Sequence, residues 1–200
     1  MSHALLIAFF VFAAVMYFTP GPNNIMVLSS GLTYGFRPTL PHIAGITVGC
    51  ALMVAAAGLG FGAIFIAYPV LQIILKFAGA AYLIYLAAVI AMAEPVTPGQ
   101  GNRRGPMTFW GAVLLQWVNV KGWVMVFGTI TAYAGIASFP WNIVIQVLLC
   151  LLLGVVAPSI WALSGSSLRA LMTSPRAVRA FNFVMAVLLL ASLFPVFIDA

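Results

Sequence analysis

The stretch YFTPGPNNIM, residues 17–26, interrupts an otherwise apolar run with two prolines, a glycine and two asparagines. Proline has no N–H, so Pro20 and Pro22 cannot donate to the carbonyls four residues before them, those of Met16 and Phe18. Unpaired backbone groups are costly in hydrocarbon, so such a break must be buried in protein or face a watery cavity. The helix that resumes beyond it presents free N–H groups and a positive dipole end, which suits a carboxylate.

The composition around this break is that of a membrane protein. Of 200 residues, 64% are hydrophobic and 5% charged, with a mean hydropathy of +1.19, whereas soluble domains carry about 25% charge. A helix needs about 20 apolar residues to cross a bilayer, and six runs come close to or exceed that length: roughly 4–35, 39–67, 69–93, 107–137, 140–165 and 180–198. We therefore expect an all-α integral membrane protein with six transmembrane helices, of which the first and fourth are interrupted.

The arginines between the runs predict the topology. Loops after the first, third and fifth runs carry all of them: Arg37, Arg103, Arg104, Arg169, Arg176 and Arg179. By the positive-inside rule these loops lie in the cytoplasm, and both termini lie in the periplasm. The net charge of +6 is spread singly or in pairs, without the clustered patch of a nucleic-acid-binding protein.

Six spans divide into three plus three, and three spans per half require the halves to be inverted. We expect one transmembrane transporter domain over 1–200, with half-repeats of about 1–93 and 107–198 and a cytoplasmic linker at 94–106. The segments NNIMVL and KGWVMVF share a Met-Val pair at an offset of 99, each just after a polar interruption. Paired interruptions in corresponding halves indicate the binding site of a transporter.

The fourth run contains LLQWVNVKGW, residues 114–123, which places Gln116, Asn119 and Lys121 near mid-membrane. Lys121 lies too far from either end to reach the headgroups, and an intramembrane charge is a functional hypothesis by default. On an intact helix Lys121 would point about 140° away from Gln116. A shared site therefore requires unwinding near Asn119 to Gly122.

The sequence leaves two roles open for each of two further basic residues. Lys76 lies seven residues after Pro69, so its ammonium either serves the site or reaches the outer interface. His42, at the cytoplasmic start of the second run, is an interfacial residue or a proton carrier. The only acids are Glu94 and Asp199, outside the spans, which leaves no material for a carboxylate sodium site or an acidic proton relay. If protons are coupled to transport, the candidates are His42, Lys121 and Lys76.

The predicted cavity holds a cation, a positive helix end, amide oxygens and freed carbonyls, which together match an amino-acid zwitterion. No metal or cofactor is expected. The candidate substrate-binding residues are Pro20, Gly21, Pro22, Asn23, Asn24, Lys76, Gln116, Asn119 and Lys121.

Three segments carry a family resemblance: TPGPNN at 19–24, LKFAGAAYLIYLA at 75–87 and LQWVNVKG at 115–122. With them the chain resembles the LysE/RhtB family of bacterial amino-acid exporters over essentially its whole length. Many members have Asn-Pro-Lys where this chain has Val120 in place of proline, and this variant looks most like the cysteine/O-acetylserine exporter branch. The resemblance implies export of small neutral amino acids across the bacterial inner membrane by a multi-pass secondary transporter driven by the proton gradient.

Other classes of function fit less well. A transmembrane thiol-redox carrier would use Cys50 and Cys150, but neither has a proline or cation nearby to activate the thiol. An intramembrane protease would need a serine with a base inside the spans, and no Gly-x-Ser-x-Gly turn occurs, so we expect no enzyme. Two small-residue pairs, Gly45-xxx-Gly49 and Gly58-xxx-Gly62, allow close helix approach, either within one chain or in a homodimer.

Overall fold

The computed structural model describes residues 2–61, 67–92, 105–171 and 174–192. These residues are all-α, as predicted, and contain no strand. A π-helical turn, η1 (Ala57–Phe61), follows α3, and a 3₁₀ turn, η2 (Ala134–Ile136), precedes α8. The α-helices are α1 (His3–Phe18), α2 (Pro22–Tyr34), α3 (Phe36–Ala56), α5 (Pro69–Ala91), α6 (Phe109–Val118), α7 (Val120–Ala132), α8 (Trp141–Leu171) and α9 (Pro175–Ala191).

Three helices, α3 with η1, α5 and α8, are each long and apolar enough to cross a membrane. Two bent pairs pass the same test when each is taken as one span: α1 with α2, bent by 51°, and α6 with α7, bent by 70°. The predicted interruptions of the first and fourth helices are therefore confirmed. Helix α9 has 17 residues, and the predicted sixth run continues to 198, beyond the described residues. Residues 94–104 of the predicted linker at 94–106 and both acids also lie outside them.

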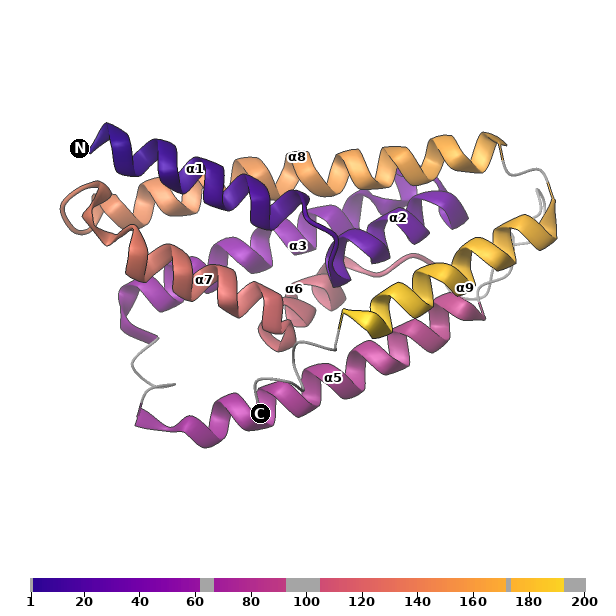
Figure 1. Cartoon of the computed structure of the whole chain (residues 1–200), viewed down its shortest axis with the longest axis horizontal. Helices are drawn as coiled ribbons and strands as arrows, with labels where there is room; N and C mark the ends of the chain where they lie inside the picture. Colours follow the sequence, from indigo (N-terminus) through magenta and orange to yellow (C-terminus); the bar gives the residue numbers. More distant parts are fainter. Residues whose placement is uncertain (1, 62–66, 93–104, 172–173, 193–200) are drawn as a thin grey trace.

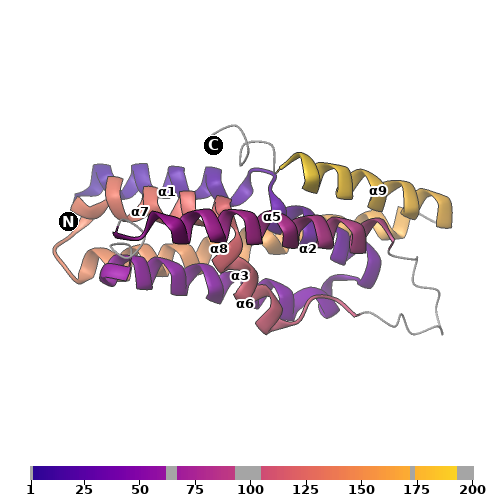
Figure 2. The ribbon, with the colours of Figure 1, turned by 90° about the horizontal axis from the view of Figure 1, so that it is seen from below.

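The helices form an elongated bundle in which successive spans alternate in direction when each bent pair is taken as one span (Figures 1 and 2). Helices α2, α5 and α8 end at one end of the bundle, where α3 and α9 begin (Figure 1). Arg37 and Arg176, in the first turns of α3 and α9, are both exposed. They therefore share this end, in agreement with the charge pattern of the loops.

The outer faces of the bundle are apolar. Helix α1 exposes Ile7, Val11 and Val15, and α5 exposes Ile73 and Phe77, as lipid-facing helices do. Polar side chains are instead buried between helices, where they can bond to one another or to freed backbone groups. They are Asn24, Ser29, Ser30, Thr33, Thr39, His42, Thr47, Gln116, Asn119, Thr129, Asn142, Gln146 and Asn182.

Helices α2 and α8 pack backbone against backbone at two glycines. A Cβ atom on Gly31 would strike the carbonyl oxygen of Ala162, and one on Gly165 would strike that of Leu28. In lipid, helix association depends on such close van der Waals packing, because lipid tails are as apolar as the side chains. These glycines therefore position α2, and with it the residues just after the first break.

The first small-residue pair of the second run acts within one chain. Gly45 lies against the backbone of Phe109, and a Cβ on Gly49 would come within 2.6 Å of the Gln116 side chain. Both contacts join α3 to α6. In the second pair, Gly58 faces Ile143, and Gly62 lies outside the described residues.

A proline inside α8 ties that helix to α3. Pro158 has no N–H to donate to the carbonyl of Gly154, four residues earlier. The hydroxyl of Thr47 donates to this freed oxygen at 2.6 Å, so the polar group is satisfied in the interior. Pro158 itself is buried and lines the cavity described below.

Candidate functional site

The first break lies between Phe18, the last residue of α1, and Pro22, the first of α2. Three carbonyls next to the break are paired locally. The Thr19 hydroxyl donates to Met16 O at 3.3 Å, and the Asn24 side-chain amide donates to Tyr17 O at 2.7 Å and to Thr19 O at 2.9 Å. Asn24 is therefore a structural cap on the end of α1 as well as a residue of the site.

The second break consists of a single residue, Asn119, which has extended backbone between α6 and α7 (φ −84°, ψ 103°). Its N–H donates to Gln116 O at 3.1 Å, and the Trp123 indole donates to Trp117 O at 2.8 Å. The break thus forms although valine follows Asn119. It is narrower than the predicted unwinding, because Gly122 already belongs to the first turn of α7.

Lys121 joins the two breaks. Its Nζ donates to Thr19 O and Thr19 Oγ1, both at 2.9 Å, and to Pro20 O at 3.3 Å. These acceptors are neutral oxygens, and charge-assisted bonds of this kind are the stronger ones. The lysine therefore reaches inward to the end of α1, so a residue more than 100 positions away completes the first break.

A second connection runs between α2 and α6. The Asn23 amide donates to Gln116 Oε1 at 2.8 Å, and Gln116 Nε2 donates back to Asn23 Oδ1 at 3.3 Å. Gln116 Nε2 also donates to Ala112 O at 2.9 Å, and the side chain is fully buried. This reciprocal pair fixes the N-terminus of α2 against the end of α6.

A cavity of about 40 Å³ lies between the two breaks, enough for a few water molecules. Its lining includes six of the predicted site residues, and two others, Pro20 and Gln116, contact lining residues. Ligand pockets are usually several times larger, so a solute larger than water requires the site to open. The lining residues are Met16, Tyr17, Gly21, Pro22, Asn23, Asn24, Ile46, Cys50, Asn119, Lys121, Gly122, Met125 and Pro158.

The electrostatics of this cavity favour a ligand that carries both a positive and a negative charge. Helices α2 and α7 both begin at it, and in the described part of the chain the N–H groups of Asn23 and Asn24 have no acceptor. Two positive helix ends and the Lys121 ammonium suit an anion. Asn119 offers an acceptor for a cation, because its Oδ1 is buried and has no hydrogen-bond partner among the described residues. A residue at the N-cap commonly uses this oxygen to cap its own helix, but Asn119 does not.

The remaining predicted residues lie elsewhere. Lys76 is half-buried on α5 and does not line the cavity. His42 is 1% exposed, and neither ring nitrogen has a hydrogen-bond partner among the residues described. It lies on α3, one turn before Ile46, which lines the cavity. His42 is thus buried in the interior of the bundle.

Several lining residues were absent from the sequence prediction. Met16, Tyr17, Ile46, Met125 and Cys50 are ordinary members of apolar runs. The one signal that could have indicated two of them is the four-residue spacing of Ile46 and Cys50, which puts them on one face of α3.

The two cysteines are buried and free. Cys50 donates to Gln116 Oε1 at 3.4 Å, and both thiols lie beside the Tyr17 hydroxyl. In the described ranges, no group of three or more His, Cys, Asp or Glu side chains could hold a metal ion.

Comparison with known proteins identifies the family to which this chain belongs. The model of the LysE type translocator family matches residues 14–195. A cysteine/O-acetylserine efflux protein of Escherichia coli is 34% identical over 196 residues, which cover 95% of this chain and 96% of that protein. A Shigella sonnei protein of the same name is 34% identical over 195 residues, covering 94% and 95%. No solved structure matches. The chain belongs to the LysE family of translocators, and it is a multi-pass membrane transporter, not an enzyme.

Proposed function

We propose that this protein exports small neutral amino acids of the cysteine and O-acetylserine type across the bacterial inner membrane. The observation that carries this proposal is the cavity between two broken helices, which combines the Lys121 ammonium, two helix N-termini and the unpaired Asn119 oxygen. The names of the similar efflux proteins support the substrate class and the direction. The described residues around the cavity include no acid, which fits a zwitterion better than a dication or a free cation.

In the proposed complex the two charged groups of the amino acid occupy opposite sides of the cavity. The carboxylate accepts from Lys121 Nζ and from the first N–H groups of α2, at Asn23 and Asn24. The ammonium donates to Asn119 Oδ1. To bind, the carboxylate competes for Lys121 with the carbonyls of Thr19 and Pro20, which couples occupancy to the geometry of the first break.

A test of this geometry is the substitution Gly21→Ala. A Cβ on Gly21 would lie 2.8 Å from Lys121 Cδ and 2.9 Å from its Nζ. Only the end of a flexible side chain must move, so the variant is expected to fold normally. The displaced ammonium loses its charge-assisted hydrogen bond to the substrate carboxylate. The free energy of one such bond corresponds to a loss of about tenfold in transport efficiency.

Gly135→Ala is the matched control for that experiment, because Gly135 lies in η2, outside the cavity lining, and its Cβ would meet only the end of the flexible Leu5 side chain, at 3.3 Å. Initial rates of uptake into inverted vesicles, normalised to inserted protein, compare the two variants. Equal rates for Gly21→Ala and wild type would mean that the position of Lys121 next to Gly21 does not matter for transport.

We further propose the six-span, inverted three-plus-three architecture with both termini in the periplasm. Helices α2 and α7 each have 13 residues and each follow a break, and Cys50 of α3 and Cys150 of α8 are 100 positions apart in the sequence, close to the offset of the shared Met-Val pair. Helix α3 packs on α8, and α5 packs on α9, as expected for equivalent helices that meet at a pseudo-two-fold axis. In this arrangement α9 and the residues after it form the sixth span.

Proton coupling is part of the proposal. The candidates are Lys121, which lines the cavity, and His42, which is buried one helical turn from a lining residue. Lys76, the third candidate from the sequence, is half-buried on α5 and does not line the cavity, so the proposal gives it no role in coupling or in substrate binding. A buried imidazole without hydrogen-bond partners can change protonation when the site opens to water.

Counterflow in proteoliposomes tests substrate and coupling together. Purified protein is reconstituted, the lumen is loaded with unlabelled O-acetylserine, cysteine, lysine or glutamate, and uptake of labelled O-acetylserine is followed at equal pH. We expect the neutral amino acids to drive counterflow and the charged ones to fail, and an imposed pH gradient to drive net flux. Counterflow by charged amino acids alone would overturn the proposed substrate class, and indifference to the gradient would overturn the coupling.

A further inference from the structure

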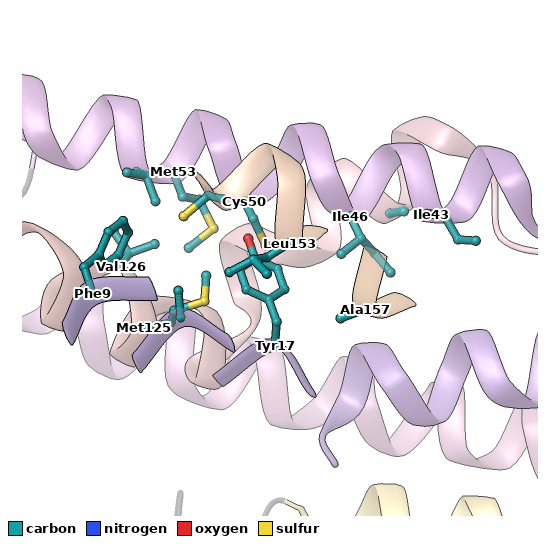
Figure 3. Close-up of a cluster of buried hydrophobic side chains, with 14 of the residues drawn as sticks. Phe9, Tyr17, Ile43, Ile46, Cys50, Met53, Met125, Val126, Leu153 and Ala157 are labelled. Atoms are coloured by element: carbon teal, nitrogen blue, oxygen red, sulfur yellow. The ribbon is translucent and has the colours of Figure 1, made fainter. Parts of the chain in front are cut away.

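One polar residue that lines the cavity has no role in the proposed binding of the zwitterion: Tyr17. Tyr17 lies on α1, one turn before the break, and is 7% exposed. Its oxygen is buried without a well-formed hydrogen bond among the described residues. Figure 3 shows the hydroxyl pointing toward Cys50, and the thiols of Cys50 and Cys150 lie beside it. Thiol sulfur is a weak acceptor, so this donor is left without a good partner.

The backbone holds this tyrosine in place. The Asn24 amide donates to Tyr17 O at 2.7 Å, so the first residues of α2 fix the end of α1. The ring packs in the main hydrophobic cluster, against which Met16 and Trp161 also lie. A phenylalanine would fill the same space and would avoid the buried, unpartnered hydroxyl. The hydroxyl is therefore best explained by something that binds it.

The surroundings of Tyr17 differ from those of Lys121. The side chains of Met16, Ile46, Cys50 and Met125 line the cavity with apolar and sulfur atoms, whereas the charged and amide groups belong to the starts of α2 and α7. A bound amino acid with its charged groups at the helix ends would direct its side chain toward these residues. The Cys50 thiol already donates to Gln116 Oε1, so the donor available on this side is the Tyr17 hydroxyl, whose neighbours are the weakly accepting thiols.

We propose that Tyr17 is a specificity-determining residue whose hydroxyl donates a hydrogen bond to an acceptor on the substrate side chain. It would favour amino acids that carry an ester or similar carbonyl over amino acids with a hydrocarbon chain of the same length. This inference rests on the proposed function and specifies the side-chain part of the same site. The ester carbonyl replaces the thiols as the partner of the hydroxyl, and no bond is made or broken.

The test is a competition experiment with the variant Tyr17→Phe. Counterflow of labelled O-acetylserine in proteoliposomes is inhibited with unlabelled O-acetylserine and, separately, with norleucine, whose side chain is an unbranched hydrocarbon. For wild type we expect O-acetylserine to compete better. In Tyr17→Phe the inhibition constant for O-acetylserine should rise about two- to tenfold, the range of one neutral hydrogen bond, while that for norleucine stays the same or falls.

Tyr133→Phe is the control, because Tyr133 packs on Phe9 and Phe12 and does not line the cavity. An unchanged ratio of the two inhibition constants in Tyr17→Phe would overturn the role of Tyr17, as would an equal rise in both, which indicates a structural effect. If wild type binds norleucine and other neutral amino acids but does not discriminate the ester, the proposed function stands and this inference falls. If wild type binds no amino acid, both fall.

Discussion

Lys121→Ala is expected to reduce transport efficiency by about ten- to a hundredfold, the range for loss of a hydrogen bond to a charged group. In the structure Lys121 is the one cation that lines the described cavity. Removing it takes away the proposed partner of the substrate carboxylate and the donor to Pro20 O, whereas Thr19 O keeps the Asn24 amide as a donor. Initial rates of labelled O-acetylserine efflux, measured over a range of substrate concentrations, give the effect.

Two further variants make this result specific. Lys121→Met keeps most of the side-chain volume without the charge, so it should lose transport to a similar extent while remaining folded and monodisperse in detergent. Lys76→Met removes the other lysine, which lies half-buried on α5 away from the cavity, and should retain transport within about twofold, as for a substitution away from the site. Equal losses in the variants of both lysines would show that position relative to the cavity does not explain the role of Lys121.

Gly31→Ala is expected to destabilise the protein by roughly 2 to 3 kcal/mol, the upper part of the range for overpacking. The added Cβ would strike the backbone carbonyl of Ala162, so α2 or α8 must shift as a whole. For a chain of this length that corresponds to a fall of roughly 5 to 10 °C in Tm. Because α2 carries Asn23 and Asn24, transport should also fall, and thermal unfolding in detergent gives the stability directly.

Gly122→Ala serves as the helical control, since its Cβ would meet only ordinary contacts at 3.7 Å and alanine favours the helix by up to about 1 kcal/mol. Its Tm should be unchanged or slightly higher. A wild-type Tm for Gly31→Ala would contradict the backbone contact between α2 and α8.

The fold was predictable from the sequence where a signal repeated. The long apolar runs indicated the all-α fold, and Pro20 with Pro22 indicated the first break. The arginines after alternate runs agree with the end of the bundle that Arg37 and Arg176 share. The second break was harder, because Val120 follows Asn119 and valine does not prevent a helix. The contact of Gly31 with Ala162 carried no signal, since glycines occur throughout the apolar runs and nothing near Gly31 in the chain indicates which helix it meets.

The site was predictable only in its polar part. Asn23, Gln116 and Lys121 are polar residues in apolar surroundings, so their role is suggested by the cost of burying them. Tyr17 and Cys50 are common in buried helices, and only the three-dimensional arrangement brings them to the cavity. The partner of Lys121 was also hidden, because main-chain carbonyls are present at every position and only the break makes those of Thr19 and Pro20 available.

The central claim, that the carboxylate of an amino acid binds Lys121 between the two broken helices, is open to direct measurement. The chain has two lysines, Lys76 and Lys121, so labelling lysine Nζ with ¹⁵N in a Lys76→Arg variant gives a single signal. A dipolar-recoupling solid-state NMR measurement with ¹³C-carboxyl O-acetylserine should place the carboxyl carbon within about 4 Å of that nitrogen, as a charge-assisted hydrogen bond requires. No dipolar coupling to Lys121 at saturating substrate would contradict the account.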